Sequence, residues 1–134
     1  MTIYALSSGQ GISGIAVIRI SGEETSKVIE LLTGKSIPKP RVATLRKINK
    51  INSSELIDEG IILWFPGPES YTGEDMAEFH IHGSKAVIDA LHVSISEVEN
   101  CRLAEPGEFT KLAFQNGKIN LLKAESIADL ISAE

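Results

Sequence analysis

Three residues whose side chains can do chemistry, Glu78, His80 and His82, are spaced two positions apart in the sequence MAEFHIH. Apolar residues fill the positions between them, which predicts a strand over residues 76–82 with one face in the core and one polar face. A carboxylate and two imidazoles at His-x-His spacing can ligate a metal, so a metal-dependent hydrolase is one interpretation. The alternative is that the histidines simply occupy a half-exposed strand face.

Two cations extend the set of candidate residues. Arg19 lies inside the apolar run IAVIRI, where a buried guanidinium needs either a salt bridge or an anionic ligand. Lys118 follows Gly117, the predicted end of a helix, and is either a surface lysine or a second anchor. With Glu78, these cations suit a ligand that has an amidine-like donor edge at one end and anionic groups at the other, and pterins have such an edge.

The composition favours one globular domain to position these residues. The chain has 134 residues, of which 43% are hydrophobic. A net charge of −5 and an aromatic content of 5% argue against a nucleic-acid clamp. No apolar run approaches the roughly 20 residues of a membrane span, and no leader is visible. Cys101 is the lone cysteine, so an internal disulfide is excluded. We therefore expect a cytoplasmic protein.

A glycine pattern near the N-terminus matches the dinucleotide-binding fingerprint in form, with glycines at 9, 11 and 14. The fingerprint must open a helix, but the β-branched run over residues 15–20 predicts a strand, which favours a hairpin-type connection. Ser21 and Glu24 then have the spacing of a capping box, which predicts a helix from Ser21 to about Leu32 that Gly34 ends.

The remaining elements complete the predicted fold class. A hairpin is expected over 42–48 and 57–65, a helix over 84–97, a short strand over 101–104, and helices from about 106 to 116 and from 121 to the end. Paired strands with helices between them predict an α+β fold, a mixed, mostly antiparallel sheet with helices packed on it. The last helix has no stop signal, so we expect the natural protein to continue.

Four stretches resemble the N-terminal domain of the tRNA-modification GTPase family called MnmE or TrmE. They are IAVIRISG (15–22), WFPGPESYTGEDMAEFHIHG (64–83), LAEPGEFTKLAFQNGKINL (103–121) and AESIADLI (124–131).

The resemblance implies the fold of the tetrahydrofolate-binding domain of aminomethyltransferases. It implies that residues 1–120 bind 5-formyl- or 5,10-methylene-tetrahydrofolate and form a homodimer, and that 121–134 begin a helical domain. By motif position, the family's folate contacts fall on Arg19, Glu78 and Lys118, and no catalytic residue falls in this chain. A folate-independent dimerisation module is the alternative within this reading.

The resemblance also implies a larger enzyme, a hydrolase that acts on GTP. The full-length protein would bind GTP, magnesium and potassium outside this chain. With the flavoprotein MnmG (GidA), it would install a carboxymethylaminomethyl or aminomethyl group on the wobble uridine of tRNA. Because the phosphate loop is absent from these 134 residues, the chain alone is not expected to hydrolyse GTP.

This chain departs from the pattern of many members at three places: the loop SSGQGIS, the stretch from His80 to Ser84, and Glu105, which replaces an arginine. The change at Glu105 reverses a charge near the expected site and would weaken anion binding.

Overall fold

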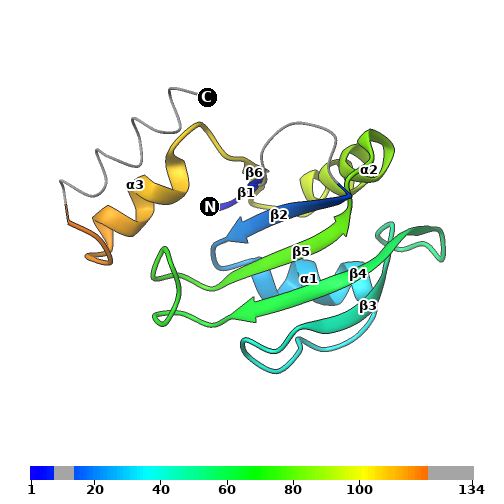
Figure 1. Ribbon diagram of the computed structural model, residues 1–134, viewed down its shortest axis with the longest axis horizontal. Coiled ribbons are helices and arrows are strands. Elements are labelled where there is room, and N and C mark those ends of the chain that lie inside the picture. Colours follow the sequence, from blue (N-terminus) through cyan, green and yellow to red (C-terminus); the bar gives the residue numbers. More distant parts are fainter. Residues whose placement is uncertain (8–13, 121–134) are drawn as a thin grey trace.

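The computed structural model describes residues 1–7 and 14–120. Its elements follow the chain as β1 (Thr2–Leu6), β2 (Ile15–Ser21), α1 (Thr25–Thr33), β3 (Thr44–Asn49), β4 (Leu56–Phe65), β5 (Met76–His82), α2 (Lys85–Ser96), β6 (Cys101–Leu103) and α3 (Glu108–Gln115) (Figure 1).

The six strands form one sheet in the order β3-β4-β5-β2-β1-β6. All neighbours are antiparallel except β1 and β6, which are parallel. The prediction of an α+β fold with a mixed, mostly antiparallel sheet is therefore confirmed. The central strands are β5, which carries Glu78, His80 and His82, and β2, which carries Arg19.

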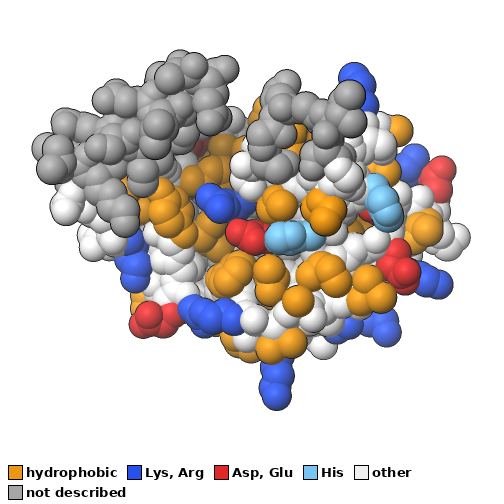
Figure 2. Space-filling view, viewed as in Figure 1, with side chains coloured by type: hydrophobic (Ala, Val, Ile, Leu, Met, Phe, Trp, Pro, Cys, Tyr) orange, Lys and Arg blue, Asp and Glu red, His pale blue; other side chains and the backbone are white. Residues whose placement is uncertain are grey.

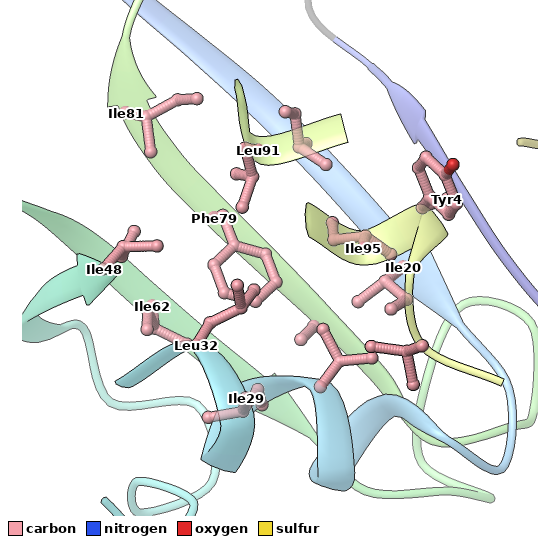
Figure 3. Packing of buried hydrophobic residues seen from close by; sticks show 14 of the residues in the cluster. Tyr4, Ile20, Ile29, Leu32, Ile48, Ile62, Phe79, Ile81, Leu91 and Ile95 are labelled. Atoms are coloured by element: carbon pink, nitrogen blue, oxygen red, sulfur yellow. The ribbon is translucent and has the colours of Figure 1, made fainter. Parts of the chain in front are cut away.

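One face of the sheet carries the core. Helix α1 passes behind β4 and β5 in Figure 1, and α2 contributes to the same buried cluster. Figure 3 shows Phe79 of β5 between Leu32 of α1 and Leu91 of α2, and all three side chains are fully buried. Burying each such side chain contributes about 1.5–3 kcal/mol, so this packing fixes which face of β5 points inward.

The opposite face of β2, β4 and β5, which we call the open face, is polar at its centre and apolar around it. Glu78 and His80 are half-buried there, beside half-buried Leu63 of β4. Two apolar side chains at the edges of this face, Ile15 and Leu45, are each 59% exposed. Figure 2 shows this face, with hydrophobic side chains surrounding a small charged group.

Several predicted boundaries are confirmed. Gly34 ends α1 and Gly117 follows α3, both with positive φ angles, 67° and 71°. Ser84 caps α2, its hydroxyl accepting a hydrogen bond from the Val87 N–H at 3.2 Å. The 42–48 and 57–65 hairpin appears as β3 and β4, paired antiparallel.

The predicted capping box at Ser21 is wrong. Ser21 is the last residue of β2 and pairs with Met76, while α1 begins only at Thr25. The Ser21 hydroxyl, completely buried, lies 2.8 Å from the Thr72 hydroxyl and donates to Glu74 Oε1 at 3.0 Å. Ser21 therefore belongs to a strand, and its hydroxyl bonds to a distant loop instead of capping α1.

The β1–β2 pairing is antiparallel, and β2 begins directly after Gly14, as expected for a hairpin-type connection rather than a dinucleotide-binding turn. Glycines 9 and 11 and the predicted helix over 121–134 lie outside the described residues. Within the described part of the chain, no helix is long and apolar enough to cross a membrane.

Candidate ligand-binding site

The centre of the site is a cross-strand pair. Arg19 of β2 lies directly opposite Glu78 of β5, so strand register brings together two residues that are far apart in sequence. Arg19 Nη2 is 3.6 Å from Glu78 Oε2, and the two side chains are 31% and 21% exposed. This separation is that of an ion pair and exceeds the usual 2.7–3.2 Å of an N–H···O hydrogen bond, so neither group is saturated by the other.

Two aromatic rings hold the Arg19 guanidinium. Its central carbon is 5.6 Å from the centroid of the Tyr71 ring and 5.8 Å from that of Phe109. These are cation–π distances, which favour a guanidinium over an ammonium at this position. Arg19 Nε is buried and has no hydrogen-bond partner among the described residues. Arg19 is therefore fixed in place while one of its donors stays unused.

The Glu78 carboxylate is held from a second direction by its neighbour on the same strand face. His80 Nε2 lies 3.0 Å from Glu78 Oε1. An ionised carboxylate offers about four lone-pair sites, so contacts with His80 and Arg19 leave sites on both oxygens. Glu78 can thus accept a pair of N–H donors from a ligand.

The loop over residues 66–75 joins this centre to α3. The Tyr71 hydroxyl lies 3.1 Å from the Thr110 hydroxyl, and the Asn116 amide donates to Thr72 O at 2.7 Å. Lys118 Nζ donates to Pro68 O at 2.9 Å. The structure therefore brings Arg19 and Glu78 into contact, and it ties Lys118 to the loop that carries Tyr71.

The three donors of the metal hypothesis separate into two pairs. His80 bonds to Glu78, whereas His82 Nδ1 lies 2.8 Å from Asp58 Oδ1 on β4. Across residues 1–7 and 14–120, no three His, Cys, Asp or Glu side chains are grouped to hold a metal ion. Burial alone would raise the pKa of the Asp58 carboxyl, but the hydrogen bonds from the backbone and ring of His82 outweigh it and lower that pKa.

Two other reactive side chains lie away from this face. Burial raises the pKa of the Cys101 thiol to about 11, so the thiol stays protonated and a poor nucleophile at neutral pH. Burial lowers the pKa of His92, whose Nε2 is buried without a hydrogen-bond partner in the described structure.

The family model described as "GTP-binding protein TrmE N-terminus" matches residues 2–118. The chain belongs to this family. It is 84% identical over 134 residues to the tRNA modification GTPase MnmE of Pelagibacter ubique, covering 100% of this chain and 30% of that protein. The MnmE of Brucella anthropi is 53% identical over 133 residues, covering 99% of this chain and 30% of the relative.

A mitochondrial relative is similarly close. The zebrafish (Danio rerio) 5-taurinomethyluridine-tRNA synthase subunit GTPB3 is 52% identical over 133 residues, covering 99% of this chain and 26% of the relative. The chain thus spans less than a third of the length of each of these three relatives.

Sequence reasoning missed several participants in the site. Tyr71 lies in the SYTGED stretch, but nothing in its spacing indicated contact with Arg19. Phe109 of α3 is half-buried, and its ring lies against the Arg19 guanidinium, a contact that was not predicted. Asp58 was not considered, because its contact with His82 depends on the register between β4 and β5.

Proposed function

We propose that this chain is the folate-binding and dimerisation domain of a tRNA-modification GTPase, and that it binds 5-formyl- or 5,10-methylene-tetrahydrofolate at the centre of the open face. The observation that carries the proposal is the Arg19–Glu78 pair, an ion pair at 3.6 Å in which both groups retain hydrogen-bonding capacity. Family membership supports the same reading.

The proposed roles follow from the chemistry of each side chain. Glu78 accepts two parallel N–H bonds from the pterin edge, which are strong because the acceptor is ionised. Arg19 and Lys118 supply positive charge for the formyl oxygen or the glutamate tail. The rings of Tyr71 and Phe109 keep the guanidinium in place when the ligand is absent.

The homodimer is proposed to form through apolar surface of this domain. The open face offers half-buried side chains of β4 and two strongly exposed ones, Ile15 and Leu45. Exposed apolar side chains around one face of a sheet suit a protein–protein contact.

The full-length protein is proposed to act in tRNA modification, as the names of its relatives state for those proteins. In this proposal the protein is cytoplasmic, residues 121–134 begin a helical domain, and GTP, magnesium and potassium bind outside this chain. The flavoprotein MnmG (GidA) and tRNA are its partners, and the reaction modifies the wobble uridine.

Calorimetric titration of the chain with 5-formyltetrahydrofolate tests the binding site. We expect saturable binding by the parent and at least a tenfold loss for Glu78→Ala and for Arg19→Ala, because each removes a charge-assisted contact. Glu59→Ala removes an exposed carboxylate from the neighbouring strand β4 and serves as the matched control.

Folded variants of Glu78 and Arg19 that bind like the parent would show that the site is misplaced. Light scattering of the same samples tests the dimer. Self-association without folate binding by the parent would favour the folate-independent dimerisation module.

A further inference from the structure

A side chain outside the expected folate contacts lies against the proposed pterin acceptor. His80 Nε2 is 3.0 Å from Glu78 Oε1, and both residues are on the same face of β5. The residues opposite His80 on the neighbouring strands are Val17 and Ile61, whose aliphatic side chains offer no hydrogen bond. The imidazole thus lies between aliphatic residues of the adjacent strands, and its Nε2 is 3.0 Å from the carboxylate.

The contact divides the accepting capacity of Glu78. Oε1 accepts a hydrogen bond from His80, and Oε2 lies 3.6 Å from Arg19 Nη2. Because each carboxylate oxygen has about two lone-pair sites, these two contacts leave one further site on each oxygen. A ligand edge with two parallel N–H donors needs one free site on each oxygen in a single plane, so the rotation of the carboxylate decides whether both bonds can form.

We propose that His80 is a positioning residue, which fixes the rotamer of Glu78 so that its carboxylate is ready to accept both N–H groups of the pterin edge. This inference rests on the proposed folate-binding function. Without His80, the longer Arg19 contact is the one restraint on the carboxylate among the described residues, and binding must then order the side chain. Immobilising a flexible side chain on binding weakens affinity by an amount on the order of tenfold.

Substitutions that keep or move the donor separate positioning from packing. The side-chain amide of glutamine can place an N–H near the position of Nε2, whereas the shorter asparagine places it near Nδ1. We expect His80→Ala and His80→Asn to weaken binding of 5-formyltetrahydrofolate roughly tenfold, and His80→Gln to restore it to within about twofold of the parent. His82→Ala is the matched control, because His82 shares the strand face but bonds to Asp58, and we expect parental affinity.

A second measurement needs no ligand. Long-range proton–nitrogen NMR spectra of the free chain should show a proton on His80 Nε2, and Glu78→Ala should shift that resonance while leaving the His82 signals in place. A His80→Ala variant that binds as the parent does, or a His80→Gln variant as weak as His80→Ala, would overturn the positioning role while leaving folate binding intact. A parent that binds no folate would overturn the proposed function and the positioning role together, even where the NMR contact is present.

Discussion

We expect the Arg19–Glu78 pair to bind the ligand without adding to the free energy of unfolding, and a double-mutant cycle tests this. At 3.6 Å and an effective dielectric constant of about 20, the Coulomb attraction is about 4–5 kcal/mol. Withdrawing each ion from water costs several kcal/mol when the ion is deeply buried. The desolvation cost is smaller for Arg19 and Glu78, because both side chains are partly exposed. Attraction and desolvation are thus of similar size.

Single and double variants should therefore behave differently. Arg19→Met leaves a half-buried carboxylate whose remaining partner in the described structure is His80, and this should lower the free energy of unfolding by about 1–3 kcal/mol. The double variant Arg19→Met/Glu78→Leu removes both charges at similar volume, and its stability should lie within about 1 kcal/mol of the parent. It should not bind 5-formyltetrahydrofolate.

Urea unfolding at pH 7.5 measures the free energies of unfolding of the parent, of Arg19→Met, of Glu78→Leu and of the double variant. All four are measured at one protein concentration, because the stability of a dimer depends on concentration. The reasoning is refuted when the double variant loses as much as the two single variants added together. That result would mean that Arg19 and Glu78 stabilise the fold independently of each other, and the pair would then need no ligand to explain it.

Two further perturbations test the packing and the electrostatics. A Cβ added at Gly60 would lie 2.3 Å from the carbonyl oxygen of His80, so Gly60→Ala should destabilise the chain by about 1–3 kcal/mol. A Cβ at Gly14 would meet no atom of the described residues within 4 Å, so Gly14→Ala should be nearly neutral in urea unfolding. Burial lowers the pKa of His92, so below the unfolded-state pKa of about 6.5 the unfolded chain binds the proton more readily and stability falls as the pH drops. The free energy of unfolding of His92→Phe relative to that of the parent should therefore increase from pH 7 to pH 5. A difference that is the same at both pH values would contradict a lowered pKa for His92.

Local patterns predicted the elements of this fold well where a single rule governed them. The alternation over residues 76–82 gave both faces of β5 correctly, and the glycine signals at Gly34 and Gly117 gave the ends of α1 and α3. The capping box failed because the hydroxyl of Ser21 is bonded to Thr72 and Glu74, which lie on a loop far along the chain.

The site was less accessible from sequence because it depends on register. The residue types at 19 and 78 indicated a cation and a carboxylate, but their direct opposition follows only from the pairing of β2 with β5. The role of His80 was likewise hidden, because its spacing from His82 suggested a metal and only the side-chain geometry separates the two histidines.

The place of β2 and β5 at the middle of the sheet has a consequence for folding. Between these strands in sequence lie α1, β3 and β4, so the Arg19–Glu78 contact closes a long loop of chain. Contacts of this kind form late, because the loop-closure entropy is lost before the paired strands stabilise the fold. Ligand-binding competence should therefore appear only as the central strands dock during refolding, after the local β3–β4 hairpin has formed, and the isolated stretch from Trp64 to Gly83 should have none.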